Sequence, residues 1–182
     1  MKKVAFYYSL LAMLIVVLGS CSKDDPAPSP GEEQRTFDVV FNVSNVQAEA
    51  GFISPVQTIQ LVNVLSNANK DKASYVKKAD ALMSNSNITI EGLKVGSELT
   101  GITINLLDNK GNKVYTNNVN LGIPVSDGKL TDSTNPCVTF LGNVASYLAT
   151  KKSATLQAVV TGGNNDVSNL KITLHTTAIF SW

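Results

Sequence analysis

The chain has 182 residues, with 15 lysines and arginines, 14 aspartates and glutamates, and a net charge of +1 at pH 7. This balance argues against a nucleic-acid partner, which needs a basic stripe, and against acidic metal-binding repeats. The single histidine excludes metal sites built from two histidines. No cofactor, no metal ligands and no catalytic residues are therefore assigned from composition.

Residues 1–20 have the pattern of a secretory signal peptide. Lys2 and Lys3 precede an uncharged apolar run over residues 4–18, and a run of about 15 residues is short for a membrane-spanning helix. The run ends in Leu18-Gly19-Ser20-Cys21, which resembles the lipobox of bacterial lipoproteins. The resemblance implies removal of residues 1–20 and attachment of fatty acyl chains such as palmitate at Cys21, which would hold the protein on a membrane. The alternative is that Cys21 lies by chance beside an ordinary cleavage site.

Ser22-Lys23-Asp24-Asp25 follows directly and resembles the export signal of lipoproteins in Bacteroidota. The chain thus resembles the small surface lipoproteins of that group, and the resemblance implies a position on the outer face of the outer membrane. The alternative is a charged, solvated linker. Residues 21–35 are rich in proline, which predicts a flexible, extended spacer of about 30 to 40 Å.

Residues 36–182 have ordinary globular composition, and a chain of this length can bury a single core. The last apolar segment is one-sided, with its apolar side chains on alternate positions from Leu170 to Trp182, so it needs a facing sheet. We therefore predict an all-β domain, an antiparallel two-sheet β-sandwich that is immunoglobulin-like in outline. Alternating or β-branched apolar patterns predict strands at 37–43, 57–65, 87–93, 100–106, 114–121, 155–160 and 170–182.

Two details of this pattern are specific. The segment 57–65 is apolar on both faces, which predicts a strand buried on both sides. Turn residues at 108–113 predict a hairpin between the flanking strands. Helical periodicity predicts one or two short helices, at 71–85 and 135–152, that cover an open edge or end of the sandwich.

The search for chemistry gives weak candidates. Cys137 and His175 could form a nucleophile and base, but a core cysteine and a strand histidine are the stronger interpretation of the two residues. Once Cys21 is acylated, Cys137 has no disulfide partner in the chain. The acids Asp38, Glu91, Glu98 and Asp108 lie in or beside strands, and the sequence gives no reason to pair any two of them as a glycosidase would.

Polar segments at 127–132 and 164–166 offer oxygen ligands for calcium, although turn chemistry explains them without a metal. A sugar-binding face would use aromatic rings, and the candidates are Tyr75, Tyr115, Tyr147, Trp182 and Phe52. Of these, Phe52, beside a loop glycine, is the first candidate for an exposed ring, although packing on the core is the commoner arrangement of such a residue.

The tripeptide Asp132-Ser133-Thr134 resembles the O-glycosylation sequon of Bacteroidota and makes Ser133 a candidate acceptor, with a plain loop as the alternative.

These patterns favour a lipid-anchored, surface-exposed, noncatalytic binding module of the bacterial outer membrane, whose partner is an envelope protein, a host surface or a glycan. The first alternative is a structural accessory subunit of an outer-membrane complex. The second is a hydrolytic enzyme with an unrecognised site.

Overall fold

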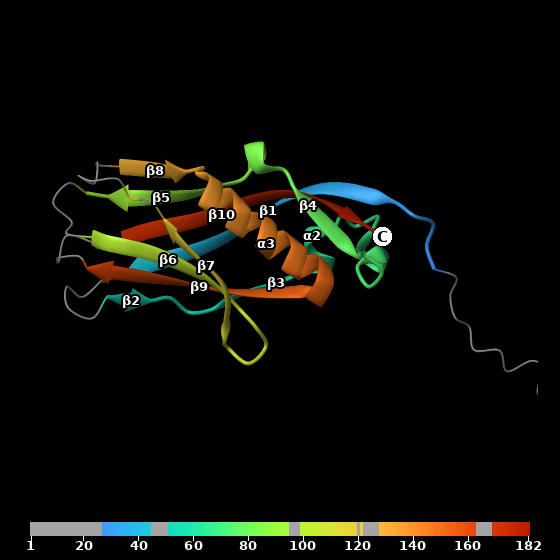
Figure 1. Ribbon diagram of the computed structural model, residues 1–182, viewed down its shortest axis with the longest axis horizontal. Helices are drawn as coiled ribbons and strands as arrows, with labels where there is room; N and C mark the ends of the chain where they lie inside the picture. Colours follow the sequence, from blue (N-terminus) through green and yellow to red (C-terminus); the bar gives the residue numbers. More distant parts are fainter. Residues whose placement is uncertain (1–26, 45–50, 95–98, 120, 122–127, 163–168) are drawn as a thin grey trace, which may run out of the picture.

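The computed structural model describes residues 27–44, 51–94, 99–119, 121, 128–162 and 169–182. Two antiparallel sheets pack face to face (Figure 1). The first contains β1 (Glu32–Ser44), β4 (Lys78–Ala81), β5 (Asn87–Leu93), β8 (Gly128–Asp132) and β10 (Asn169–Ser181). The second contains β2 (Phe52–Ile53), β3 (Gln57–Gln60), β6 (Leu99–Leu107), β7 (Lys113–Val119) and β9 (Ser153–Gly162).

The strand order is β1-β10-β5-β8 in the first sheet and β2-β9-β6-β7 in the second. The short strands β4 and β3 extend the pairing of the long strands β10 and β9. This interleaved order, in which the chain passes repeatedly from one sheet to the other, is that of a jelly roll. The predicted all-β, two-sheet sandwich is confirmed. The immunoglobulin-like outline holds for the two packed antiparallel sheets, while the connectivity within them is that of a jelly roll.

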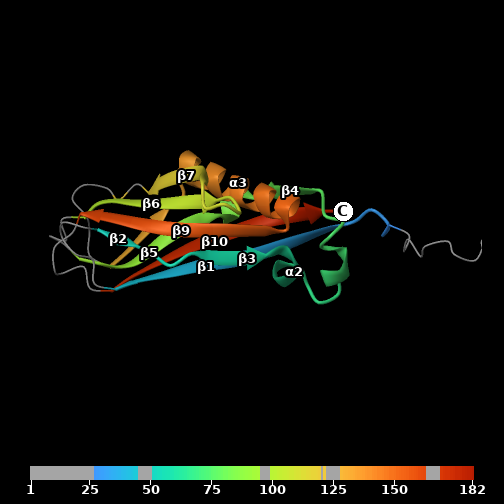
Figure 2. The same cartoon turned by 90° about the horizontal axis from the view of Figure 1, so that it is seen from below.

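The core lies between the sheets, which Figure 2 shows edge on. Alternate residues of β10 from Leu170 to Phe180 face inward and are buried, as the one-sided pattern predicts. They meet inward residues of the other sheet such as Ile104 and Leu156, and all belong to one hydrophobic cluster. Each fully buried aliphatic side chain contributes about 1.5 to 3 kcal/mol to folding, so this cluster is the main source of stability.

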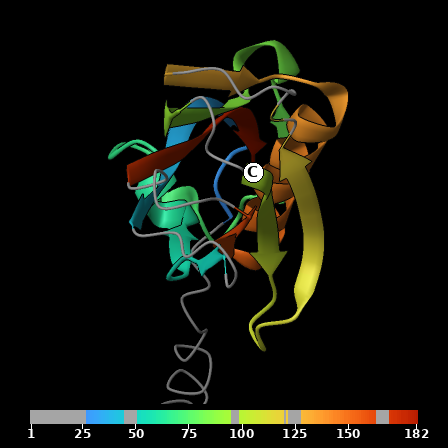
Figure 3. The same ribbon diagram turned by 90° about the vertical axis from the view of Figure 1, so that its left-hand side faces the viewer.

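The helix α3 (Asn135–Lys151) covers the open side of the sandwich. It packs against β4 of one sheet and β7 of the other, and Figure 3 shows it beside both. Pro136 lies in its first turn, and Leu141 and Leu148 are fully buried. The predicted helix at 135–152 is confirmed, as is its role in closing an edge. Lys152 ends it in a left-handed conformation, with φ of 66°.

The predicted helix at 71–85 is wrong. The segment forms a 3₁₀ turn η1 (Lys70–Lys72), the strand β4 and a second 3₁₀ turn η2 (Met83–Asn85). The end of β10 extends beyond β5 and leaves backbone groups unpaired, and β4 pairs with them through positions such as Ala79 opposite Phe180. Because a ladder satisfies those groups and a helix would not, tertiary pairing overrides the helical periodicity.

The predicted strand at 57–65 is also partly wrong. Only Gln57–Gln60 are a strand, largely exposed, and a single helical turn α2 (Leu61–Val64) follows. Pairing with β9 ends opposite Ser153, where β9 begins, so the chain can turn and bury Leu61 and Val64. The remaining predicted strands and the hairpin at 108–113 are confirmed, with ends that shift by up to five residues.

The domain begins earlier than the sequence predicts. β1 starts at Glu32, so residues 32–35, which we assigned to the linker, are part of the sheet. The Glu33 carboxylate accepts hydrogen bonds from the Ser66 N–H and the Asn69 side-chain amide. The expected linker thereby shortens to residues 22–30, which reach about 28 Å when extended at 3.1 Å per residue. No helix in the described part of the chain is long and apolar enough to span a bilayer.

Candidate functional site

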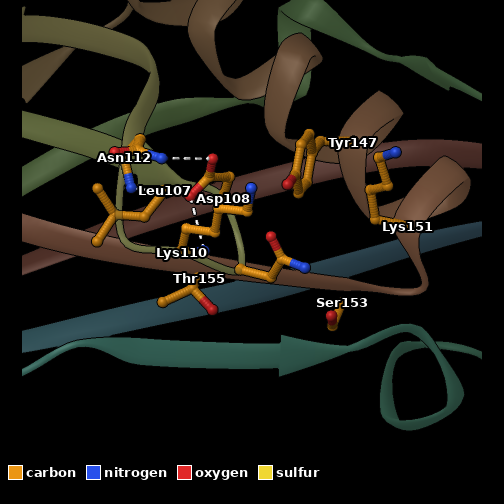
Figure 4. A pocket seen from close by; sticks show the side chains of 9 residues that line it. Leu107, Asp108, Lys110, Asn112, Tyr147, Lys151, Ser153 and Thr155 are labelled. Atoms are coloured by element: carbon orange, nitrogen blue, oxygen red, sulfur yellow. Dashed lines mark hydrogen bonds between the residues drawn. The ribbon is translucent and has the colours of Figure 1, made fainter.

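A depression in the described surface lies between the β6–β7 turn and the C-terminal half of α3. Its volume is about 610 Å³, within the range of small-molecule sites. Figure 4 shows the turn on one side, α3 on the other and β9 below. Its principal lining residues are Asp108, Lys110, Asn112, Tyr147, Lys151 and Thr155.

The turn that forms one wall is organised by Asp108. Its Oδ1 accepts hydrogen bonds from the N–H groups of Lys110 and Asn112, both at 2.8 Å, and its Oδ2 accepts one from the Asn112 side-chain amide at 3.0 Å. The side-chain bond from Asn112, followed by the backbone bonds, holds the pKa of Asp108 below its usual value. The carboxylate therefore stays ionised, and both oxygens stabilise the turn.

The opposite wall is a second face of α3. Asn143, Tyr147 and Lys151 follow one another at four-residue spacing, which places them on one side of a helix. A smaller depression of about 180 Å³ lies between this face and Tyr115 of β7, whose side chain is 44% exposed. It shares Tyr147 and Lys151 with the larger depression. We call the two together the Tyr147 groove.

Seven polar side chains of the Tyr147 groove make no hydrogen bond or ion pair with the part of the chain that the structure describes: Asn109, Lys110, Tyr115, Asn143, Tyr147, Lys151 and Ser153. They offer amide, hydroxyl and ammonium groups to a ligand. Two lysines and one carboxylate line the larger depression, which gives it one surplus positive charge.

The structure does not bring Cys137 and His175 together. Cys137 is fully buried in the first turn of α3 and donates a hydrogen bond to the Asp132 carbonyl oxygen at 3.1 Å. Burial raises its pKa to about 12, so the thiol stays protonated. His175 lies on the outer face of β10, where Nδ1 is 2.7 Å from the Asp38 carboxylate. The dyad is not formed, and the interpretation as a core cysteine is confirmed.

The candidate acids are also separate. Asp38 pairs with His175, and Glu91 lies between Lys129 at 3.2 Å and Lys171 at 3.7 Å. The hydrogen bond from Lys129 and then the charges of both lysines lower the pKa of Glu91. Asp108 belongs to the hairpin turn, and Glu98 lies outside the described residues.

The calcium-loop alternative at 127–132 is wrong for the part that the structure describes, because Gly128–Asp132 form β8. Asp132 is buried and accepts hydrogen bonds from the N–H and hydroxyl of Thr134 at the start of α3. Asp127 and residues 164–166 lie outside the described residues. Among the described residues, no three cysteines, histidines or acids gather in a way that would hold a metal ion.

Two further sequence candidates have different outcomes. Phe52 is half-buried in β2 and packs on the core, as the alternative interpretation of this residue predicts, and Tyr115 is more exposed than Phe52. Ser133 is exposed between β8 and α3, which leaves the glycosylation hypothesis as a prediction. Cys21 lies outside the described residues.

The groove itself was missed by sequence reasoning. Its signal is the four-residue spacing of Asn143, Tyr147 and Lys151, which runs beside the apolar stripe of the same helix. Two faces on one helix, one apolar and one mixed aromatic and polar, suggest that the second face contacts something other than the core.

No protein-family model matches the chain, and no curated protein sequence matches it. Among solved structures, similar chains occur in Desmodium yellow mottle tymovirus, at 9% identity over 89% of this chain and 93% of that chain, with a TM-score of 0.32. Turnip yellow mosaic virus gives 14% identity over 85% and 82%, with a TM-score of 0.36. A decameric BFDV capsid protein gives 13% identity over 85% and 99%, with a TM-score of 0.37. TM-scores this low support no conclusion about function.

Proposed function

We propose that the protein is a lipid-anchored, surface-exposed, noncatalytic binding module of the bacterial outer membrane, and that it binds its ligand in the Tyr147 groove. The observation that carries the proposal is the set of uncommitted polar groups in the groove, beside the rings of Tyr115 and Tyr147. The carboxylate in the groove, Asp108, is committed to its turn. This arrangement suits recognition, since a binding site needs a few oriented polar groups beside an apolar or aromatic surface.

The lipid anchor rests on the lipobox that ends at Cys21. The short tether between Cys21 and β1 would hold the domain close to the membrane, with the end that carries Gly31 and Trp182 nearest the lipid (Figure 1). The groove lies on the side of the sandwich, along α3, where this end does not cover it.

The anchor is tested by mass spectrometry of the amino terminus and by a Cys21→Ser variant. We expect an acylated Cys21 in the native chain and loss of membrane attachment in the variant. Protease treatment of intact cells should degrade the native protein, since it faces outward. A soluble native protein that is cleaved at another bond would contradict the anchor.

The binding role is tested by screening the full-length protein, in mild detergent, against an array of neutral and charged oligosaccharides. Binding that Tyr147→Ala abolishes and Tyr75→Ala preserves would support the proposal. Tyr75 is the matched control because it is half-buried outside the groove. Binding that survives Tyr147→Ala, or a complete absence of binding, would contradict a ligand site in the groove.

An accessory subunit of a membrane complex remains the second candidate, because two large apolar side chains are exposed along the β2–β3 edge of the sandwich. Ile53 is 64% exposed and Val56 is 52% exposed, and edge strands with apolar side chains favour association. Under this alternative, a membrane protein should co-purify with the native chain in mild detergent and be lost from a variant that combines Ile53→Lys with Val56→Lys. Co-purification that is unchanged in this variant would count against the edge.

A further inference from the structure

We infer that the ligand of the Tyr147 groove is an anionic saccharide, whose acidic group lies between Lys110 and Lys151 and whose sugar ring packs against Tyr147. This inference rests on the proposed function and specifies the chemistry of the same site. It is carried by the charges of the groove, by its aromatic side chains and by its shape.

The charge comes from two lysines on opposite walls. Lys110 lies in the hairpin turn and Lys151 in the last turn of α3, and both line the larger depression. Elsewhere on the surface, Lys78, Lys129 and Lys171 each lie beside a carboxylate, whereas Lys70, Lys77 and Lys113 form no ion pair among the described residues. Neither groove lysine has such a partner among the described residues. A bound carboxylate or sulfate would supply the missing counter-charge and form charge-assisted hydrogen bonds.

The fixed carboxylate does not cancel this charge. Asp108 faces the depression, but three hydrogen bonds from its own turn occupy its two oxygens. Its negative charge offsets one of the two lysines, so one positive charge remains for a ligand. A neutral sugar would leave that charge unpaired, and a cation would be repelled by it.

The aromatic side chains favour a saccharide over a simple anion. Tyr147 lies in the wall of the larger depression, opposite the hairpin turn (Figure 4). Tyr115 lines the smaller depression, which continues from Tyr147. Flat rings match the apolar faces of sugars, and the phenol hydroxyl offers a hydrogen bond. A small inorganic anion would use the lysines and leave both rings without a function.

The shape indicates more than one sugar unit. The larger depression of about 610 Å³ lies within the size range of small-molecule sites, and the smaller one of about 180 Å³ extends it along α3 toward Tyr115. Asn143 and Thr150 line this extension and offer amide and hydroxyl groups. An oligosaccharide could place its acidic unit at the lysines and a neighbouring unit between the two tyrosines.

The test is calorimetric titration of the full-length protein in mild detergent at low salt. The carboxylate probe is a hyaluronan hexasaccharide, and its fully methyl-esterified form is the neutral control with the same sugars. The second probe is a chondroitin sulfate hexasaccharide, which carries both sulfate and carboxylate, and it is compared with its desulfated form, its methyl-esterified form and the neutral form that is both desulfated and esterified. We expect at least one acidic probe to bind about tenfold more tightly than its neutral form, and this difference to shrink as salt is raised.

Variants locate the acidic group. Lys110→Gln and Lys151→Gln should each weaken binding of the acidic probe by about threefold to tenfold and leave the neutral form unchanged. Tyr147→Ala should weaken both forms. Lys77→Gln is the matched control, because Lys77 is exposed, lies outside the groove and has no side-chain partner among the described residues. Circular dichroism verifies that each variant is folded.

The outcomes separate this inference from the proposed function. If acidic and neutral probes bind equally and Tyr147→Ala removes both, the anionic ligand is wrong and the binding groove stands. If the acidic preference survives in the Lys110→Gln and Lys151→Gln variants, the lysines do not bind the anion and the inference fails. If no acidic probe binds, the inference also fails, and the oligosaccharide array then decides the proposed function by itself. For the chondroitin probe, loss of affinity on desulfation alone identifies sulfate as the bound group, and loss on esterification alone identifies carboxylate.

Discussion

The main chains of Gly31 and Trp182 exchange two hydrogen bonds. The Gly31 nitrogen lies 3.1 Å from the Trp182 carbonyl oxygen, and the Trp182 nitrogen lies 3.0 Å from the Gly31 carbonyl oxygen. The indole ring of Trp182 lies against Gly31, where an added Cβ would be 3.0 Å from three ring atoms. The residues before the first strand and after the last strand are therefore fastened to one another at the end of the domain that follows the tether.

This contact predicts the effect of Trp182→Ala. The ring is half-buried and packs on the core, so its loss should lower the free energy of unfolding by about 2 kcal/mol, less than for a fully buried tryptophan. Urea unfolding followed by circular dichroism measures the change, because the variant lacks the only tryptophan of the chain. Trp182→Phe should recover about half of the loss. An unchanged midpoint for Trp182→Ala would show that the ring does not stabilise this end.

Gly92→Ala should be more damaging than Gly111→Ala. Both glycines have positive φ, 88° and 83°, which costs an alanine about 1 to 2 kcal/mol. At Gly92, in the irregular part of the β5–β8 pairing, the new Cβ would also lie 2.2 Å from the Asn169 carbonyl oxygen, whereas nothing lies within 4 Å at Gly111.

We therefore expect Gly92→Ala to cost at least 2 kcal/mol more than Gly111→Ala in thermal or urea unfolding. Equal costs would mean that the backbone at Asn169 moves away freely.

Cys137 should resist alkylation in the folded protein. Burial and then the charge of Asp132 raise its pKa to about 12, so the thiolate that reacts with iodoacetamide is scarce and is also covered. At pH 8 we expect fast labelling in urea and almost none without it, measured by mass spectrometry. Rapid labelling of the folded protein would show that the first turn of α3 opens readily.

The same thiol makes stability depend on pH. In the unfolded chain the cysteine pKa is about 8.5, while in the folded chain it is raised to about 12. Between these two values the thiol ionises only in the unfolded state. Its contribution to the free energy of unfolding is therefore complete below about pH 8.5 and decreases by about 1.4 kcal/mol per pH unit above it. Cys137→Ala should remove this slope between pH 9 and pH 10. A slope that is identical in the variant would assign it to other groups.

Lys152 holds the end of α3 against the chain before β4. Its Nζ donates hydrogen bonds to the carbonyl oxygens of Ala149, at 2.7 Å, and Val76. Lys152→Met keeps most of the side-chain volume but leaves both oxygens without this donor, and should cost about 1 to 3 kcal/mol in urea unfolding. Lys77→Met, at an exposed position, is the control and should change stability by less than about 0.5 kcal/mol. Equal effects of the two variants would contradict a specific role for Lys152.

The elements that the sequence predicts correctly are those whose hydrophobic pattern or turn residues lie within the element itself. Alternation over 87–93 and 170–182 and the turn residues after Leu107 determine strands and a hairpin without reference to the rest of the chain. The two-sheet architecture follows because the one-sided last strand needs a cover.

The errors occur where distant pairing decides. At 71–85 the apolar residues do have helical spacing. Lys78–Ala81 nevertheless form a strand, because they pair with the free edge of β10, about 100 residues later in the chain. The Tyr147 groove is missed for a similar reason. Asp108 and Lys110 meet Tyr147 and Lys151 only because α3 packs beside β7, and this neighbourhood follows from the sheet order, which local patterns do not determine.

The thirteen residues of β1 give the molecule a particular response to mechanical force. They pair along their whole length with β10, and β1 runs in the direction of the long axis (Figure 1). Under the proposed function, tension between a membrane anchor and a ligand held on α3 would slide β1 along its neighbour and load many hydrogen bonds at once. A tether that instead left at right angles to the strand would open the same ladder like a zipper, one bond after another.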